Sequence, residues 1–389
     1  MIQEFLYQQQ IGILVFVCAL CLIALYNLMM RKRLGDSPAT EYKPMVSILV
    51  PARNEAHNIK VCLHSLLNQD YEPYEVIVLD DESQDSTPEI LKQLSRECSH
   101  LITLTGQPPP FGWLGKNWAC HQLSQVAQGD LILFVDADTH HHPRMLSEVV
   151  AAISATQADL LSGLPRQELK TWGERLILPM LPWAVLSFFP IRLFQRLPFS
   201  FFSIAVGQFM IFRRTAYTQI GGHAAVRSSV TEDFALAHLA KKNALRWEFV
   251  DLNGRVSCRM YHNFKQVLAG LSKNLFAVFG HNLPVFLFIW FWLAIVFIQP
   301  ILSLILYSLG RPLPGFSPIL ALVAVALSLF SWLVSSWFSR LPLVLAAAYP
   351  LIIALNGLIA VRSAWFHYTQ NSITWKGRAL KPSRRREDT

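Results

Sequence analysis

Charged residues are scarce in this sequence of 389 residues. Asp, Glu, Lys and Arg together make up 15% of the chain, whereas hydrophobic residues make up 52%. Soluble domains usually carry about 25% charged residues, so the composition argues against a wholly soluble protein.

Long runs of basic residues are also missing. The 34 Lys and Arg residues outnumber the 26 Asp and Glu residues, which gives a formal net charge of +8, yet the longest basic runs, such as Arg384-Arg385-Arg386, have only three residues. Nucleic-acid recognition needs a clustered basic face, so we expect no nucleic-acid partner. In a membrane protein such an excess usually marks cytoplasmic flanks of the spanning helices.

The six cysteines lack the spacing of a disulfide or metal framework. Cys18 and Cys21 form a CxxC, but it lies inside an apolar run, where packing within a membrane helix is the simpler interpretation. Reduced cysteines fit a cytoplasmic domain.

A long apolar run lies near the start of the sequence. Residues 11–30 have about the length needed to cross ~30 Å of hydrocarbon, and the basic cluster Arg31-Lys32-Arg33 follows at once. No basic segment precedes the run and no small-residue cleavage site follows it. We therefore interpret residues 1–34 as a membrane anchor rather than a removed signal peptide, with residue 31 onward in the cytoplasm.

Three further apolar runs, at 283–309, 318–338 and 342–362, predict a C-terminal membrane region over residues 281–364, followed by a basic tail over 365–389. Four complete crossings would put this tail outside, although positive charge favours the inside. Either one C-terminal segment is re-entrant or lies in the interface, or the number of spans differs by one. We favour a cytoplasmic tail.

Another apolar stretch, residues 172–206, interrupts the middle of the chain. It carries prolines and arginines, so it is a poor spanning segment. Amphipathic helices that lie in the bilayer surface fit this pattern best, and a proline-rich buried loop is the alternative.

The region from 44 to 275 has the composition of a globular domain. Apolar strands are expected at 45–50, 74–79, 101–104 and 130–135, with helices at 54–68, 88–97 and 117–128. Strands that alternate with helices predict an α/β fold whose parallel sheet is covered on both faces. In such sheets ligands bind at the carboxyl ends of the strands.

Polar clusters follow three of these strands at the point where each strand ends. They are Arg53-Asn54-Glu55, Asp80-Asp81 and Asp136-Ala137-Asp138, and we expect them to converge in space. No GxGxxG follows the first strand and the sequence has no Walker A motif, so neither a dinucleotide site nor a P-loop is supported. Carboxylates one residue apart can instead hold Mg²⁺ or Mn²⁺ together with a diphosphate, as a nucleotide-sugar site requires.

Five segments, in this order, resemble the inverting glycosyltransferases of family 2. They are VSILVPARNE (46–55), VIVLDDESQDS (76–86), GDLILFVDADT (129–139), GQFMIFRRTAYTQIGG (207–222) and TED (231–233). The resemblance covers residues 44–275. It implies a GT-A fold, an α/β nucleotide-diphospho-sugar transferase domain, accompanied here by α-helical transmembrane segments.

The resemblance assigns donor binding to residues of the strand-end clusters. Pro51, Arg53 and Glu55 match the motif that borders the nucleotide base and ribose. Asp80 and Asp81 match the acidic pair that holds the uracil and ribose. The implied donor is therefore a UDP-sugar.

The same resemblance implies the catalytic centre. Asp136 and Asp138 match the DxD motif that holds Mn²⁺ or Mg²⁺ at the donor, with Asp138 as the direct metal ligand, and Asp233 matches the catalytic base. A carboxylate within hydrogen-bond reach can take the acceptor's proton as the acceptor attacks the anomeric carbon. The metal neutralises the departing diphosphate, and one in-line displacement inverts the anomeric centre.

Further candidates border this centre. Lys116 matches a GK-type motif that reaches the diphosphate; a solvated loop lysine is the alternative. A role in closing the site over the donor or in contacting the acceptor is a further prediction for seven residues: Gly207, Gln208, Glu232, Arg259, Lys273, Lys376 and Arg378. For the basic residues among them, a cytoplasmic flank of the membrane segments is the alternative.

The acceptor side departs from the processive polysaccharide synthases of this family, because their QxxRW motif is missing from its expected place after TED. Residues 259–264 (RMYHNF), 270–274 (GLSKN) and 375–378 (WKGR) instead resemble the membrane glycosyltransferases of carotenoid glycoside pathways and, more distantly, ceramide glucosyltransferases. This implies a non-processive enzyme that transfers a sugar, glucose by preference, to a hydroxyl or carboxyl of a membrane lipid, by preference a carotenoid or related isoprenoid. A glycolipid synthase acting on ceramide, diacylglycerol or a hopanoid, a processive polysaccharide synthase, and a non-catalytic scaffold are the alternatives.

Overall fold

The computed structural model describes residues 1–98, 100–369, 373–375 and 378–380, and the chain divides into two compact units. The sheet unit contains residues 32–168 and 193–260, together with the two short strands β11 (Ile373–Trp375) and β12 (Arg378–Leu380). The helical unit contains residues 1–31, 169–192 and 261–369. The division differs from the expected boundaries at 44 and 275, because residues 169–192 and 261–275 pack with the apolar helices.

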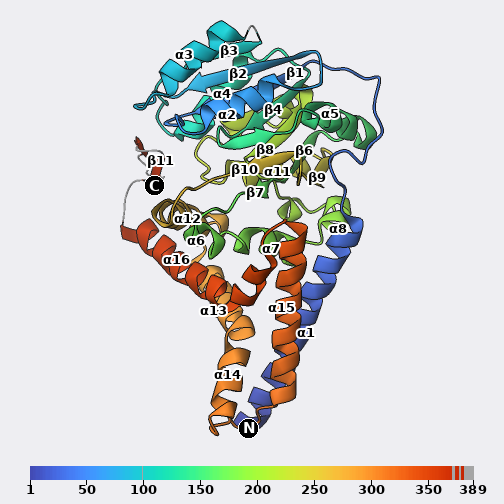
Figure 1. Cartoon of the computed structure of the whole chain (residues 1–389), viewed down its shortest axis with the longest axis vertical. Helices are drawn as coiled ribbons and strands as arrows, with labels where there is room; N and C mark the ends of the chain where they lie inside the picture. Colours follow the sequence, from blue (N-terminus) through green and yellow to red (C-terminus); the bar gives the residue numbers. More distant parts are fainter. Residues whose placement is uncertain (99, 370–372, 376–377, 381–389) are drawn as a thin grey trace, which may run out of the picture. The chain divides into compact units, whose positions relative to one another are not determined.

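A seven-stranded sheet forms the centre of the sheet unit (Figure 1). In spatial order its strands are β3 (Leu101–Thr105), β2 (Tyr74–Asp80), β1 (Val46–Ala52), β4 (Leu131–Val135), β8 (Phe209–Arg213), β6 (Leu160–Leu164) and β9 (Trp247–Asp251). The first four are parallel, as predicted from the alternating pattern. β8 is antiparallel to β4 and β6, so the sheet is mixed rather than wholly parallel.

The direction of β8 matters for the candidate site. Val135, the last residue of β4, pairs with Phe209, the first residue of β8. Gly207 and Gln208 therefore lie at the edge where β4 ends, although no predicted strand pointed to this pairing.

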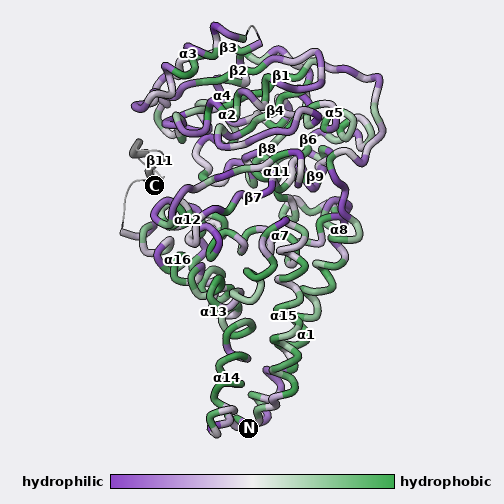
Figure 2. Tube along the Cα trace, viewed as in Figure 1, coloured by the Kyte–Doolittle hydropathy of each residue, from purple (hydrophilic) through white to green (hydrophobic). Residues whose placement is uncertain are grey.

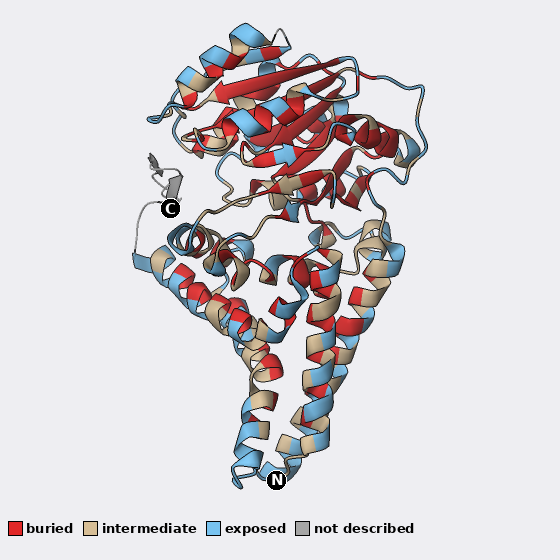
Figure 3. Ribbon diagram, viewed as in Figure 1, coloured by how far each residue is buried: buried red, intermediate tan, exposed pale blue. Residues whose placement is uncertain are grey.

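Helices cover the sheet and shield its strands from solvent (Figures 1 and 3). They are α2 (Ile59–Leu67), α3 (Thr87–Glu97), α4 (Gly115–Val126), α5 (Met145–Thr156), α9 (Arg214–Gln219), α10 (Gly222–Ala225) and α11 (Glu232–Lys242). Every residue of β1 and of β4 is buried, which explains why their sequences are apolar except for Ser47. Helix α2 begins at residue 59 rather than 54, so residues 53–58 form a connection at the sheet edge.

A small three-stranded sheet lies in the same unit. It consists of β5 (Thr139–His141), β10 (Val256–Cys258) and β7 (Arg166–Gln167). Cys258 pairs with Thr139 on one side and with Gln167 on the other. The residue that follows the DxD motif is thereby joined to the residue that precedes the RMY segment.

The helical unit is apolar along most of its length (Figure 2). Its helices are α1 (Ile2–Met30), α6 (Trp172–Arg175), α7 (Met180–Phe188), α12 (Phe264–Val278), α13 (Leu283–Phe297), α14 (Gln299–Ser308), α15 (Pro318–Phe338), the 3₁₀ helix η2 (Leu343–Ala348) and α16 (Tyr349–Thr369). By length and composition, four segments are able to cross a membrane: Ile2–Met30, Leu283–Ser308, Pro318–Phe338 and Leu343–Thr369. These agree with the four predicted apolar runs.

The predicted interfacial stretch 172–206 is shared between the two units, and its first part packs against α1. The Asn27 amide of α1 donates hydrogen bonds of 2.7 Å to the carbonyls of Leu186 and Phe189. The buried Trp183 stacks on Trp332 of α15, with ring centroids 4.6 Å apart. Helix α8 (Ile191–Arg196) and the 3₁₀ helix η1 (Ser200–Phe202) follow, and residues from 193 onward belong to the sheet unit.

Helices α1 and α15 run in the same direction. Near their beginnings, the Gln10 side chain accepts a hydrogen bond from the Ser317 backbone N–H at 3.0 Å. At their ends, the Arg31 guanidinium lies 5.7 Å from the ring centres of Trp337 and of Phe338. The segment α13–α14 precedes α15 in a hairpin, so α13 begins at the end of the helical unit where α1 and α15 finish.

Helix α16 returns to that same end instead of crossing the unit. Its first residue, Tyr349, lies against Trp332 near the end of α15, with ring centroids 6.3 Å apart. Near its end, His367 stacks on His281 just before α13, at 4.1 Å between centroids. The segment 343–369 therefore returns towards the end of the helical unit from which it starts, as Figure 1 shows. That it is re-entrant in a membrane stays a prediction.

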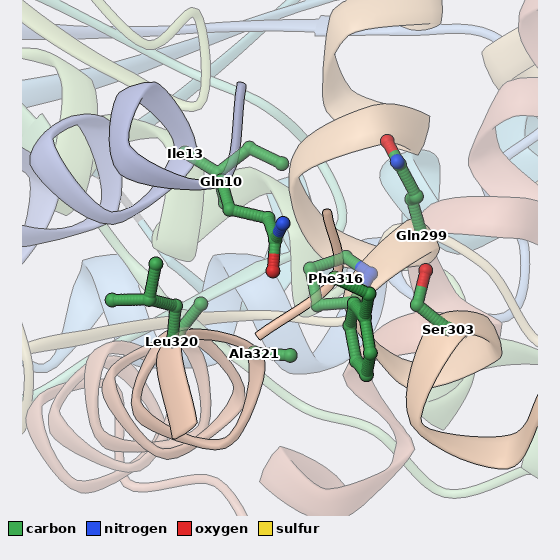
Figure 4. A pocket seen from close by; sticks show the side chains of 9 residues that line it. Gln10, Ile13, Gln299, Ser303, Phe316, Leu320 and Ala321 are labelled. Carbon is green, nitrogen blue, oxygen red and sulfur yellow. The ribbon is translucent and has the colours of Figure 1, made fainter. Parts of the chain in front are cut away.

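Polar side chains join the opposite end of these helices (Figure 4). The amides of Gln9 and Gln299 exchange hydrogen bonds of 3.1 and 3.2 Å. Gln10, Gln299 and the buried Ser303 line a small pocket between α1, α14 and α15. In an apolar bundle such hydrogen bonds fix neighbouring helices against one another.

Candidate active site

The polar clusters that follow β1, β2 and β4 lie at one edge of the sheet. Ala52 pairs with Asp80 across β1 and β2, and the Asp81 backbone N–H donates to the Ala52 carbonyl at 2.8 Å. β4 pairs in parallel with the other side of β1. The predicted convergence of the three clusters is thus a consequence of strand register.

The donor-side cluster is held by the side chain of Arg53. Its Nη1 donates to the carbonyl oxygens of Asp81 and, at 3.1 Å, Glu82, and lies 3.9 Å from Asp81 Oδ2. Asp81 is fully buried, so this cation is positioned to compensate its charge. Asp80, the last residue of β2, accepts a hydrogen bond from the Ser83 N–H of the following turn at 3.3 Å.

Two other predicted donor residues have clear structural places. The Glu55 backbone N–H donates to Thr87 Oγ1 at 2.9 Å, and Glu55 Oε2 accepts from the Asn58 amide at 3.0 Å. Pro51 lies within β1, opposite Leu79 of β2, and is buried there. Pro51 therefore shapes the end of the strand, and Glu55 anchors the connection to α2.

Lys116 lies between two carboxylates that are far apart in the sequence. Its Nζ is 2.9 Å from Asp136 Oδ1 and 2.9 Å from Glu232 Oε1. Lys116 is on the first turn of α4, Asp136 follows β4, and Glu232 begins α11. The alternative of a solvated loop lysine is wrong, because this side chain connects the DxD motif to TED.

Asp233 lies close to Lys116 and Glu232, and it is hydrogen-bonded to the backbone of Gly207. The Gly207 N–H donates to Asp233 Oδ2 at 3.0 Å, and the Phe234 N–H donates to Oδ1 at 2.8 Å. A Cβ atom on Gly207 would lie 3.2 Å from Lys116 Nζ, 3.4 Å from Glu232 Oε1 and 3.5 Å from Asp233 Oδ2. The missing side chain of Gly207 thus leaves room for three charged groups around one point.

The charges of these residues, together with their burial, shift the pKa values of Lys116, Glu232 and Asp233. Burial opposes the charge of Lys116, but the carboxylates of Asp136 and Glu232 outweigh it and hold the pKa of Lys116 well above its usual range. Burial likewise opposes ionisation of Glu232, yet Lys116 lowers the pKa of Glu232 below its ordinary value. For Asp233, burial and the neighbouring charge of Glu232 raise the pKa to about 7.

The second DxD carboxylate, Asp138, contacts Cys258, which the sequence analysis did not place in the site. The Cys258 thiol donates to Asp138 Oδ1 at 3.4 Å and accepts from the Gln208 amide at 3.1 Å. Burial, followed by the charge of Asp138, raises the pKa of the Cys258 thiol well above its ordinary value. Gln208 also accepts from Gln167 at 3.2 Å. Gln208 is thus a buried link behind the DxD motif.

Asn117 is a second residue that sequence reasoning missed. Its side-chain Nδ2 lies 2.9, 3.2 and 3.0 Å from the carbonyl oxygens of Val226, Arg227 and Ser229. This buried amide ties α4 to the loop that precedes TED. Its position directly after Lys116 was the available signal.

The remaining predicted residues are distributed between the units. The Arg259 backbone N–H donates to the Asp138 carbonyl at 3.3 Å, so Arg259 is adjacent to the DxD motif. Lys273 lies on α12 in the helical unit. Lys376 lies outside the described residues, and Arg378 is described only as the first residue of β12.

A metal would need ligands beyond the protein. Among the residues that the structure describes, no three or more His, Cys, Asp or Glu side chains form a cluster able to hold an ion. Mg²⁺ commonly binds through one or two carboxylates plus substrate phosphates, at hard oxygen donors. Asp136 and Asp138 fit that pattern, in which the diphosphate supplies the other ligands.

Comparison with known sequences explains this arrangement. The model of glycosyl transferase family 2 matches residues 47–221, from β1 to the turn after α9. Residues 47–221 form a glycosyl transferase family 2 domain. The predicted family resemblance is thereby confirmed.

The glycosyltransferase domain is similar to proteins that have different names. A 4,4'-diaponeurosporenoate glycosyltransferase of Staphylococcus haemolyticus is 26% identical over 248 residues, which are 63% of each chain. A beta-monoglucosyldiacylglycerol synthase of Trichormus variabilis is 39% identical over 109 residues, 28% of this chain and 23% of the relative. Glycosyltransferase AglE of Haloferax volcanii is 36% identical over 126 residues, 32% of this chain and 40% of the relative. The chain thus spans less than two thirds of the length of each.

A solved structure supports the fold over most of the chain. The mannosyltransferase PcManGT from Pyrobaculum calidifontis, determined with GDP-Man and Mn²⁺, superposes with a TM-score of 0.53 at 17% identity. The match covers 94% of this chain and 99% of that one. The predicted GT-A fold is confirmed.

Enlarging Gly207 tests the geometry of the glycosyltransferase domain. We expect Gly207→Ala to slow sugar transfer several-fold and Gly207→Val at least tenfold, about 1.4 kcal/mol, because the new side chain displaces Lys116. Thermal unfolding should change little, since Gly207 lies at the partly exposed end of a turn. Gly357→Ala is the control, because its Cβ would meet only Trp290 at 3.7 Å. Full activity of Gly207→Val would refute this placement.

The raised pKa of Asp233 predicts an unusual acid limb in the pH–rate profile. A catalytic base must be ionised, so kcat/KM should fall as the pH drops through about 7, instead of near 4. Glu232→Gln removes the charge that raises this pKa and releases Lys116 towards Asp233. The acid limb should therefore move to lower pH in Glu232→Gln; a limb that stays in place would show that another group titrates.

Proposed function

We propose that this protein transfers a single sugar from a UDP-sugar to a hydroxyl or carboxyl group of a membrane lipid, with inversion at the anomeric carbon. The observation that carries the proposal is the meeting of Lys116, Glu232 and Asp233 around Gly207, beside the DxD motif of a family 2 domain. A base, a cation and a metal-type carboxylate pair are what an in-line displacement of a diphosphate requires.

Each residue of the group has a distinct role in this mechanism. Asp233, oriented by the N–H groups of Gly207 and Phe234, takes the proton of the acceptor as it attacks the anomeric carbon. Lys116 supplies positive charge for the leaving diphosphate. Mn²⁺ or Mg²⁺, held by Asp138 and Asp136, would add further positive charge there when bound. The displacement needs no covalent enzyme intermediate.

A lipid acceptor is supported by two features. Four helices of this chain are long and apolar enough to cross a membrane. Two relatives carry names that refer to a carotenoid acid and to diacylglycerol. We propose glucose as the sugar and a carotenoid or related isoprenoid as the acceptor, with diacylglycerol-type glycolipid synthesis as the second candidate.

We also propose that the sheet unit is cytoplasmic and touches the bilayer surface through residues 193–202. The side chains of Leu193, Phe199 and Phe201 are 48%, 60% and 83% exposed. They directly follow residues 169–192, which pack with α1 and α15. Exposed aromatic side chains near Arg196 in the sequence are typical of segments that lie in a membrane interface, and the apolar helices are close by in the sequence.

The transfer reaction can be tested on detergent-purified protein. Radiolabelled UDP-glucose, Mn²⁺ and a total lipid extract containing carotenoids should yield label in one lipid species that carries one hexose, as seen by thin-layer chromatography and mass spectrometry. Asp233→Asn should bind UDP and lose transfer by orders of magnitude. A ladder of products would instead establish a processive synthase. The DxD assignment would be refuted if the protein bound UDP equally well without metal and if Asp138→Ala bound UDP as well as the unsubstituted protein.

We also propose that the segment containing α16 is re-entrant, which makes a separate topological prediction. Single cysteines introduced at Glu41, Arg311 and Thr369, all exposed positions, would be treated with a membrane-impermeant maleimide in intact cells. Arg311→Cys should react from outside, whereas Glu41→Cys and Thr369→Cys should react only after lysis, with the unsubstituted protein as background. Labelling of Thr369→Cys in intact cells would show that α16 crosses completely.

A further inference from the structure

We propose that Lys116 is a tethered cation that occupies the carboxylate site of the donor-free protein, so that a divalent ion has to compete with it. The inference rests on the proposed donor chemistry and goes beyond it, because it assigns Lys116 two successive partners. In the absence of donor these are Asp136 and Glu232; with donor bound, the diphosphate replaces them.

The contacts of Lys116 place it where a metal ion would also need to bind. Its Nζ lies 2.9 Å from Asp136 Oδ1, and Asp136 is the first carboxylate of the DxD motif. The second contact, at 2.9 Å to Glu232 Oε1, holds the ammonium from the opposite side. Side chains of these residues are only 24%, 25% and 9% exposed, so the ion pairs are poorly screened by solvent.

The backbone around Lys116 holds the ammonium in this place. The Leu114 N–H, just before α4, donates to the Arg227 carbonyl at 2.9 Å. The Asn117 side chain holds the same loop through three carbonyls. Both ends of the first turn of α4 are therefore fixed to the loop before TED, and Gly207 lies against the ammonium.

Removing the charge of Lys116 should consequently have opposite effects on two ligands. Mn²⁺ alone should bind more tightly, since Asp136 loses its internal cation and the surrounding carboxylates keep their negative charge. UDP in the presence of Mn²⁺ should bind more weakly, since the diphosphate loses a cationic partner. General damage to the site would weaken both, so the opposite signs are diagnostic.

The experiment measures binding, without an acceptor, on the detergent-purified full chain. Electron paramagnetic resonance reports free Mn²⁺, and isothermal titration calorimetry reports UDP. We expect Lys116→Met to tighten Mn²⁺ binding at least tenfold and to weaken UDP binding at least tenfold. Lys116→Arg, which keeps the charge, is the matched control and should change neither ligand by as much.

The proposal is overturned if a folded Lys116→Met protein binds Mn²⁺ no more tightly than the unsubstituted protein. Loss of UDP binding alone would make Lys116 a donor ligand only. Should Lys116→Met not fold, Lys116→Gln keeps hydrogen-bond donors for Asp136 and Glu232 and must show the same tightening of Mn²⁺ binding. A wrong lipid acceptor leaves these results unchanged, whereas an unsubstituted protein that binds Mn²⁺ but no UDP contradicts the proposed function.

Discussion

The ion pairs of Lys116 are the interaction on which the arrangement of the site depends. Three carboxylates, those of Asp136, Glu232 and Asp233, approach one point at the edge of the sheet. Two like charges about 4 Å apart repel by about 4 kcal/mol at an effective dielectric constant of 20. Lys116 offsets this repulsion for Asp136 and Glu232, whereas burial and, after it, the charge of Glu232 raise the pKa of Asp233.

This balance links structure to chemistry. A base is useful near neutral pH when its pKa lies close to the working pH. The pKa of Asp233 is raised by burial and by Glu232, while Lys116 keeps Glu232 ionised. The neighbours of Asp233 thus set the pKa of its carboxyl group, and the backbone N–H groups of Gly207 and Phe234 orient that carboxylate.

The helical unit is held together by packing of apolar helices. Polar side chains join its apolar helices near both ends. Gln9, Gln10 and Gln299 join one end of the unit, and Asn27 joins α1 to the carbonyls after α7 near the other end. Arg31, which directly follows α1, lies at the end of the unit to which α16 also returns.

The sequence by itself determined the parallel half of the sheet, the four apolar segments and the family. Val46–Val50, apart from Ser47, and Leu131–Val135 are apolar because both faces of their strands are covered, and DxD directly follows the second strand. Such signals are local. These signals are fixed by the order of residues along the chain and by which of those residues are buried.

Tertiary structure alone decided the rest. The antiparallel β8 brings Gly207 to Asp233, and α4 brings Lys116 between Asp136 and Glu232. Cys258 reaches Asp138 through a three-stranded sheet whose strands are short. The return of α16 likewise places His367 against His281. Each is a contact between residues distant in the chain, and local sequence patterns do not encode which distant residue a side chain will meet.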